Sequence, residues 1–150
     1  MTNKIMKSVV AAYIEVNDKF LIAQRADGKF KGKWEFPGGK NEPGECDEVA
    51  IQREIKEELN LDIKAHELMG STYEDIPADS REDKKTIILK LYNCELLGGD
   101  LQLRAHSDYR FISKDEINNY ELCTADYKLL NSVPDKSVKR VRRPQEKDSN

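Results

Sequence analysis

The stretch at residues 39–61, GKNEPGECDEVAIQREIKEELNL, constrains this chain more than any other. Its residues 46–59 are predicted to form a helix. Residues three and four apart are neighbours on a helix surface, so Glu54, Glu57 and Glu58 are expected to share one face. A stripe beside that face is apolar and can pack on a core, since aliphatic residues recur there every four positions, at Ile51, Ile55 and Leu59.

Two interpretations of the acidic face are open. Because 35% of the residues are charged, the glutamates can simply form a solvated face. Alternatively, they bind a metal. Like charges at this spacing repel, and Lys56 is expected to lie too far round the helix to relieve them. A divalent cation would relieve them, because clustered carboxylate oxygens suit hard ions such as Mg²⁺, which often bridge carboxylates to phosphates.

The spacing of the whole stretch resembles the Nudix box, G-x5-E-x7-R-E-U-x-E-E-x-G-U, where U is aliphatic. The defined positions are occupied by Gly39, Glu45, Arg53, Glu54, Glu57, Glu58 and Leu61. Asn60 replaces the glycine of the motif. That position is expected to need a left-handed backbone at the helix end, which Asn tolerates better than any residue except Gly. The chain is therefore similar to the Nudix hydrolases.

The resemblance implies a metal site. Glu57 and Glu58 are expected to bind Mg²⁺ directly, with Mn²⁺ as an alternative ion. Glu54 is expected to bind the metal or to act as the base, and the Gly39 carbonyl completes the set of ligands. The sequence does not assign which glutamate deprotonates the attacking water.

A structural role is expected for two further residues of the box. Arg53 and Glu45 are predicted to form an ion pair that fixes the turn against the helix.

The segment KWEFPGGK at residues 33–40 resembles the MutT-like branch of the family, which hydrolyses nucleoside triphosphates to the monophosphate and pyrophosphate. Within this segment, Gly38 and Lys40 are expected to contact the substrate. Arg25 resembles an arginine that contacts phosphate in the same branch.

The same branch has a P-A-N or P-A-D segment that reads the edge of the base, and Thr124-Ala125-Asp126 lies at the corresponding place. Asp126 is therefore the candidate base reader; a carboxylate accepts hydrogen bonds, and a protonated carboxyl also donates one. The alternative is an exposed acid near a helix N-terminus, where the helix dipole favours a negative charge.

The chain departs from the family pattern at one further acidic position. Relatives often carry a glutamate, a metal ligand or base, immediately before a His-x4-aromatic segment. His106 and Phe111 preserve that frame, but Ala105 occupies the glutamate position. Either Asp108 substitutes, or the helix carboxylates and water suffice.

The rest of the chain predicts a mixed α/β fold. Strands are expected at residues 7–16, 20–25, 34–36, 64–73, 86–97 and 109–112, tight turns at 17–18, 37–39 and 98–100, a polar loop at 75–85, a capped helical turn at 113–119 and a helix at 124–133 with Thr124 as its N-cap. Strands followed by a crossing helix and a closing helix predict one α+β domain. The resemblance specifies it as an α/β/α sandwich with a mixed sheet.

Length and charge bound the organisation. The 150 residues suit one domain at 1–133, followed by a basic polar tail at 134–150 that is either a flexible solvated segment or a contact for RNA or an acidic partner. The loop at 27–33 is likewise either a solvated connection or a cationic rim for phosphates. The net charge of −3 predicts no stable nucleic-acid partner.

Location follows from what the sequence lacks. No stretch resembles a signal peptide or a membrane span, so no membrane partner is expected. Cys46, Cys94 and Cys123 are odd in number and widely spaced, which favours free thiols in a reducing cytoplasm. A monomer and a homodimer are both compatible with the sequence.

The resemblance implies a Mg²⁺-dependent nucleoside triphosphate pyrophosphohydrolase. Its substrate would be an oxidised nucleotide such as 8-oxo-dGTP, or a pyrimidine triphosphate such as CTP. One alternative is a hydrolase of ADP-ribose or another sugar nucleotide on the same fold. The other is a Nudix-like module that senses nucleotides without cleaving them.

Overall fold

The computed structural model describes residues 4–76 and 84–134. In chain order the elements are β1 (Lys4–Val16), β2 (Lys19–Arg25), β3 (Trp34–Glu35), β4 (Gly38–Lys40), α1 (Asp47–Leu59), β5 (Leu61–Ile76), β6 (Lys84–Gly99), β7 (His106–Ile112), the 3-10 helix η1 (Lys114–Asn119), α2 (Thr124–Lys128) and the 3-10 helix η2 (Leu129–Ser132). In this part of the chain, no helix is long and apolar enough to cross a membrane.

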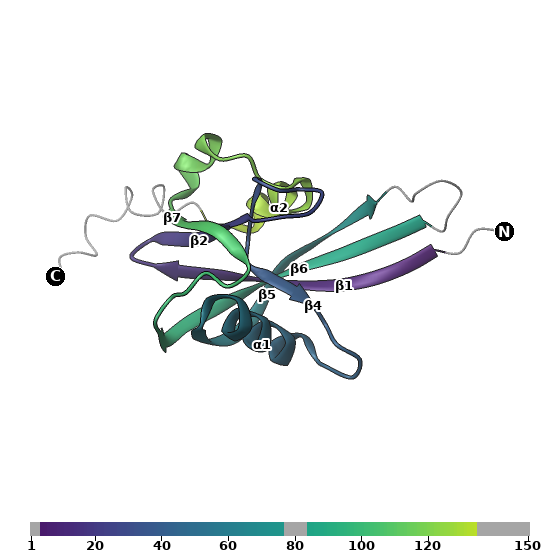
Figure 1. The fold of residues 1–150 in the computed structure, drawn as a ribbon, viewed down its shortest axis with the longest axis horizontal. Helices are drawn as coiled ribbons and strands as arrows, with labels where there is room; N and C mark the ends of the chain where they lie inside the picture. The colour runs from purple at the N-terminus through teal and green to yellow at the C-terminus, as the bar shows by residue number, and fades with distance from the viewer. Residues whose placement is uncertain (1–3, 77–83, 135–150) are drawn as a thin grey trace, which may run out of the picture.

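The strands form one mixed sheet. Their order is β3-β2-β1-β6-β5, with β4 paired to β1 and β7 paired to β2. Strands β1 and β6 run parallel, and the other pairs are antiparallel. Helix α1 lies on one side of the sheet and α2 on the other (Figure 1). The expected α/β/α sandwich with a mixed sheet is therefore confirmed.

Strand β1 divides the core in two, because successive side chains of a strand point to opposite faces. Val10, Ala12 and Ile14 pack toward α1, against the aliphatic stripe that includes Ile51 and Ile55. The residues between them on β1, together with Phe36, Leu129 and Leu130, belong to a second cluster on the other face. Full burial of each such aliphatic side chain stabilises the fold by about 1.5–3 kcal/mol.

Two predicted local features are present. Asn17 and Asp18 both have positive φ, 54° and 65°, and join β1 to β2 in a two-residue hairpin whose turn matches the twist of the strands. Asn60 has φ 58° and ψ 34°, and its N–H donates to the carbonyl of Lys56. The left-handed helix end predicted from the glycine-to-asparagine departure is thus confirmed.

The prediction of a tight turn at residues 37–39 is wrong. Gly38 and Gly39 lie in the short strand β4, which pairs antiparallel with β1, and neither has a positive φ. The requirement for glycine is one of space. A Cβ on Gly38 would overlap the carbonyl oxygen of Val10, so any larger residue would force β4 away from β1.

The ends of other elements also differ from the prediction. Strands β5, β6 and β7 are longer than expected, because paired hydrogen bonding continues into polar residues at their ends. The turn expected at 98–100 begins within β6, and residues 101–104 form no strand. Of the loop expected at 75–85, the outer positions belong to β5 and β6, while residues 77–83 lie outside the described part of the chain, as does the tail from 135 onward.

The C-terminal helix begins at Thr124, as predicted, but its N-cap is one residue earlier and the helix divides in two. Cys123, with φ −57° and ψ 148°, is the N-cap, and its carbonyl accepts a hydrogen bond from the N–H of Tyr127. Thr124 is already inside α2, so its assignment as the N-cap is wrong. After Lys128 the helix tightens into the 3-10 helix η2.

Candidate active site

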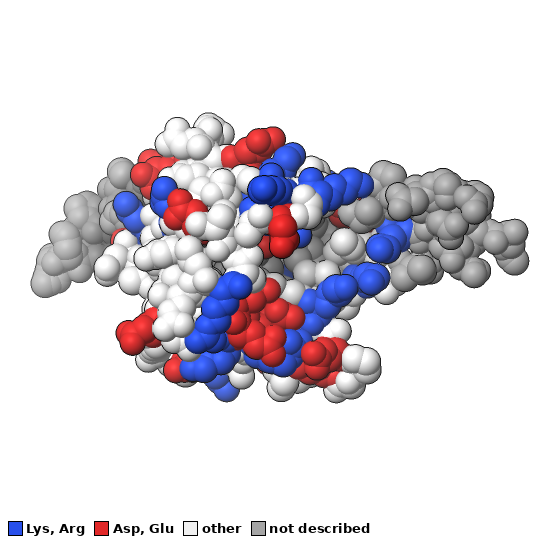
Figure 2. Space-filling view, in the orientation of Figure 1, with Lys and Arg blue, Asp and Glu red and all other residues white. Residues whose placement is uncertain are grey.

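A cleft of about 540 Å³ is lined by strand β4, two glutamates of α1, the start of α2 and the face of β1 and β6 that packs toward α2. Its lining includes most of the predicted site residues, namely Arg25, Gly38, Gly39, Lys40, Glu54, Glu58 and Asp126. A patch of carboxylates lies over α1 at the lower centre of Figure 2, with basic side chains on both sides of it.

Glu54 and Glu58 are the two helix glutamates that line the cleft. Gly39 lies against Glu54 so closely that a Cβ at position 39 would overlap the carboxyl group. Glycine is therefore required for β4 and α1 to approach each other here.

Glu58 is largely buried, and its Oε1 atom has no hydrogen-bond partner among the described residues. Burial raises the pKa of Glu58 well above its usual range, and the neighbouring carboxyl of Glu54 raises it further through a hydrogen bond and its negative charge. Burial and the adjacent carboxyl thus both disfavour a negative charge on Glu58.

Glu57, the third predicted glutamate, does not line the cleft. Its side chain is 59% exposed and contacts Arg53 at 3.2 Å, and Arg53 also contacts Glu54 at 3.2 Å. Arg53 thus relieves part of the repulsion along the acidic face. Lys56, as expected, does not serve this purpose, because it pairs with Asp62.

The predicted ion pair between Arg53 and Glu45 is present. Arg53 donates from Nε and Nη2 to the two carboxylate oxygens of Glu45, at 2.6 and 2.9 Å. Its Nη2 also donates to the carbonyl of Lys40. These bonds connect the loop before α1, the helix itself and strand β4. Hydrogen bonds from Arg53 lower the pKa of Glu45 to about 2.

The segment after β6 is held against the C-terminal end of α1. The backbone N–H groups of Gln102 and Arg104 donate to the carbonyls of Leu59 and Glu58, at 2.9 and 3.0 Å. These bonds satisfy carbonyls that have no partner inside the helix. They also deliver the chain to Ala105, which lines the cleft, and to His106 at the start of β7.

His106 is a site residue whose contacts the sequence did not indicate. Its side chain is 4% exposed, and Nε2 hydrogen-bonds to Oε2 of Glu35 at 2.9 Å. Its other ring nitrogen, Nδ1, has no hydrogen-bond partner in the described part of the chain and lies 4.0 Å from Oε1 of Glu58. Oε1 of Glu35 accepts a hydrogen bond from Arg25 at 2.9 Å. Glu35 therefore joins the predicted phosphate-binding arginine to the histidine.

Asp126 is buried, which excludes the alternative of an exposed acid at a helix N-terminus. Its Oδ1 accepts a hydrogen bond from the backbone N–H of Phe36 at 2.9 Å. Burial raises the pKa of Asp126 well above its usual range, and the negative charge of Glu35 adds to this effect. Burial and this neighbouring charge thus both favour the neutral form of Asp126.

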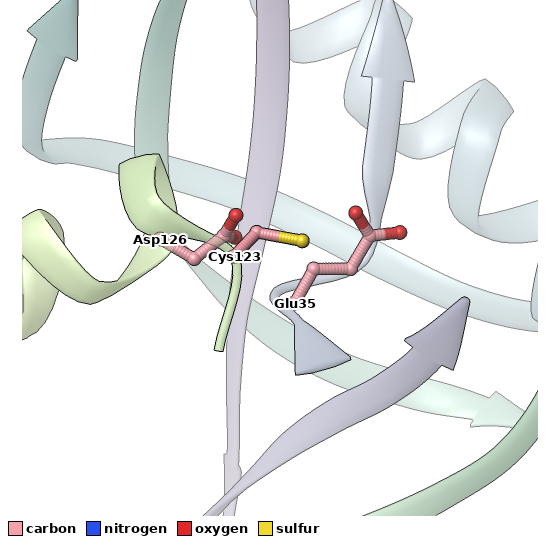
Figure 3. Close-up of side chains that lie close together, drawn as sticks. All are labelled: Glu35, Cys123 and Asp126. Atoms are coloured by element: carbon pink, nitrogen blue, oxygen red, sulfur yellow. The ribbon is translucent and has the colours of Figure 1, made fainter. Parts of the chain in front are cut away.

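Glu35, Cys123 and Asp126 form one cluster in the wall of the cleft, with ligand atoms within 4.8 Å of one another (Figure 3). The Cys123 thiol points from the start of α2 toward Glu35. Burial raises the pKa of this thiol to about 12. Because Arg25 already binds Glu35 and the thiol is neutral, the cluster is better suited to hydrogen bonding with a ligand than to holding a cation.

The geometry bears on two alternatives that the sequence leaves open. Asp108 lies outside the lining of the cleft and pairs with Arg110, which favours the alternative in which the helix carboxylates and water suffice. From the loop at 27–33, Asp27 and Phe30 line the cleft but its lysines do not, which agrees with a solvated connection rather than a cationic rim.

The carboxylate end of the cleft fits a divalent cation. The unpartnered Glu58 oxygen, the adjacent Glu54 carboxyl and the close approach of Gly39 provide oxygen ligands in a space that a Cβ would fill. Such a set suits Mg²⁺ or Mn²⁺.

Comparison with known proteins agrees with this geometry. A sequence model of the NUDIX domain matches residues 5–133. A CTP pyrophosphohydrolase of Escherichia coli is 36% identical over 126 residues, covering 83% of this chain and 89% of that protein. The nucleoside triphosphatase NudI of Escherichia coli is 30% identical over 132 residues, covering 83% and 94%.

The fold is also found in a solved structure. A MutT Nudix hydrolase from Burkholderia pseudomallei superposes with a TM-score of 0.74 at 23% identity, covering 86% of this chain and 98% of that one. The match over residues 5–133, with a cleft bounded by the glutamates of α1 and the glycines of β4, shows that this chain belongs to the Nudix family.

Proposed function

We propose that this protein hydrolyses a nucleoside triphosphate to the monophosphate and pyrophosphate, using Mg²⁺ or Mn²⁺. The observation that carries the proposal is the unpartnered oxygen of Glu58, which lies beside Glu54 and Gly39 in the cleft. Relatives named CTP pyrophosphohydrolase and nucleoside triphosphatase support the choice of a triphosphate.

Glu54, Glu58 and the Gly39 carbonyl would hold the cation, and Glu57 would join them by turning away from Arg53. A bound Mg²⁺ supplies charge neutralisation on the phosphates and lowers the pKa of a nearby water. The carboxylates would also accept the proton of the attacking water. Arg53 keeps α1 and β4 in register, so that Glu54 faces Gly39.

The opposite wall of the cleft would receive the nucleoside. Asp126, whose neutral form is favoured by burial, can donate a hydrogen bond to a base, and a carboxylate oxygen of Glu35 can accept one. Arg25 pairs with Glu35 and lines the cleft, so its other N–H groups would be available to the phosphates. These groups suit a base edge that carries both a donor and an acceptor, such as that of cytosine or of an oxidised purine.

The cellular role would be the removal of unwanted nucleotides such as 8-oxo-dGTP, or the hydrolysis of pyrimidine triphosphates such as CTP. Cys46, Cys94 and Cys123 are all free thiols, which supports a reducing cytoplasmic location. Residues 1–133 would suffice for this activity, since the site residues all lie before Pro134.

The first test is a screen for pyrophosphate release with Mg²⁺. The panel holds the natural ribo- and deoxynucleoside triphosphates, 8-oxo-dGTP, 5-methyl-dCTP and ADP-ribose. Glu58→Gln removes a site carboxylate, and Glu48→Gln, an exposed glutamate of the same helix, is the matched control. Pyrophosphate that Glu58→Gln loses and Glu48→Gln retains would support the proposal.

Two other results of the screen would replace the proposed function with a different one. Release of a sugar phosphate from ADP-ribose alone would identify a sugar-nucleotide hydrolase. Tight binding of a nucleotide without turnover would identify a sensing module.

A further inference from the structure

Two lysines lie just beyond the lining of the cleft, on the strand face that forms its floor. Val9 of β1 and Ile87 of β6 both line the cleft. Alternate residues of a strand face the same side, so Lys7, two residues before Val9, and Lys85, two residues before Ile87, lie on that same face. In the parallel pairing of β1 with β6, Lys7 is opposite Ile87 and Lys85 is opposite Ile5. Both lysines therefore lie at one end of the floor.

Lys40 brings a third ammonium group to this end. It lines the cleft, pairs with Val9 across β4 and β1, and directly follows Gly39 at the carboxylate site. The pKa of Lys7 is lowered first by the charge of Lys40 and then by that of Lys85, and a hydrogen-bond contact with Lys40 lowers it further. Lys7 thus lies close enough to each of the other two lysines to be repelled by its charge.

Within residues 4–76 and 84–134, none of these three lysines forms an ion pair with a carboxylate. Glu74, which lines the same cleft, is paired with Lys128 at 3.1 Å. Asp47, at the start of α1, is paired with Lys90 at 2.9 Å. Figure 2 shows basic side chains extending from the carboxylate patch toward the ends of β1 and β6. Three gathered cations without an anion indicate a site for an anionic ligand.

We propose that Lys7, Lys40 and Lys85 form a subsite for the terminal phosphate of the substrate's polyphosphate chain. The subsite begins beside Gly39, where the carboxylates would hold the metal and the scissile phosphates, and runs outward along β1 and β6. It would make the enzyme distinguish nucleoside triphosphates from diphosphates, because a diphosphate is too short to reach Lys7 and Lys85. This inference rests on the proposed function.

Kinetics with the best triphosphate from the screen and its diphosphate test the subsite. Lys7→Met with Lys85→Met removes two charges and keeps the side-chain length. Lys19→Met with Lys64→Met, at exposed positions away from the cleft, makes the same change in net charge and is the control pair.

Charge-assisted hydrogen bonds of about 1.5–3 kcal/mol predict that the Lys7→Met, Lys85→Met protein loses roughly ten- to hundredfold in kcat/KM for the triphosphate. The diphosphate should change by less than about threefold, as should both substrates in the control pair. Equal losses for the two substrates, or no loss, would overturn the proposal.

A direct binding measurement tests the subsite independently of catalysis. Inorganic tripolyphosphate and pyrophosphate are titrated calorimetrically in EDTA, where no metal contributes. The Lys7→Met, Lys85→Met protein should lose at least about tenfold in affinity for tripolyphosphate relative to the control pair. It should also melt no lower than the control, since the removed charges repel each other. If no nucleotide is hydrolysed, the proposed function fails, and this titration still decides the subsite; unchanged tripolyphosphate affinity would refute it.

Discussion

Nδ1 of His106 and Oε1 of Glu58 lie 4.0 Å apart, and neither atom has a hydrogen-bond partner within residues 4–76 and 84–134. The other nitrogen of the same ring is bound to Glu35. The histidine thus lies between the wall of the cleft that would read the base and the carboxylate that would hold the metal. A side chain in this position can fix both acids at once.

Replacing His106 with Leu should reduce kcat by roughly ten- to hundredfold and raise KM much less, because the lost bond to Glu35 involves a charged group worth about 1.5–3 kcal/mol. His66→Leu removes an exposed histidine that contacts Glu95, and it should leave both constants nearly unchanged. Steady-state kinetics on the two variants is the measurement. A matching loss of kcat in both would mean that His106 has no special role in the cleft.

Gly39→Ala tests the approach of β4 to α1. Its methyl group would overlap the Glu54 carboxyl, so Glu54 has to move. We expect activity to fall by at least about tenfold and the Mg²⁺ concentration for half-maximal activity to rise, because a ligand is displaced. At Gly98 a Cβ meets nothing within 4 Å, which makes Gly98→Ala the control. Normal Mg²⁺ activation of Gly39→Ala would show that Glu54 is not a ligand.

The Glu45–Arg53 pair predicts how stability depends on pH. The pKa of Glu45 falls from about 4.3 in an unfolded chain to about 2 in the fold. The ionised carboxylate therefore stabilises the fold above pH 5, and this contribution is lost as the pH falls from about 5 toward 2. Glu45→Gln should melt below the wild type at pH 7, and the difference should shrink progressively toward pH 2.5. The exposed Glu48→Gln should follow the wild type throughout; a Glu45→Gln difference independent of pH would contradict the linkage.

Asp126 is expected to change the stability with pH in the opposite direction from Glu45. Its pKa is raised in the folded state, so the fold binds this proton more tightly than the unfolded chain does. The carboxyl therefore costs stability above pH 4, and the cost grows with pH until the folded-state pKa is reached. Asp126→Asn keeps an acceptor for the Phe36 N–H and has no charge to bury. It should melt a few degrees higher than the wild type at pH 8, and the gain should vanish near pH 4.

A lower melting temperature of Asp126→Asn at pH 8 would contradict the burial penalty. Base reading is tested with Asp126→Ala, because a methyl group neither donates nor accepts a hydrogen bond. Asp126→Ala should change the ranking among bases more than the turnover of the best substrate, and an unchanged ranking would contradict the contact with the base.

Much of the fold follows from local pattern. The aliphatic stripe of α1, the left-handed Asn60 and the Asn17-Asp18 hairpin all depend on residues within a few positions of one another, and each is present. The ends of β5 and β6 were not predictable in this way, since they depend on where two polar strands stop pairing. The tight turn expected at Gly38 and Gly39 failed for a similar reason, because their role is to make room for β1 and α1.

The sequence by itself determined the carboxylate end of the site. Glu54 and Glu58 share a helix face because helical geometry places residues four apart together, and the pair of Glu45 with Arg53 follows from an equally local spacing. Only the tertiary structure decided the rest. His106 and Glu35 are 71 residues apart, and Phe36 and Asp126 are 90 apart. Likewise, Lys7 and Lys85 meet through the register of two parallel strands. Such contacts depend on how strands align across the sheet, which is set by the packing of the whole core.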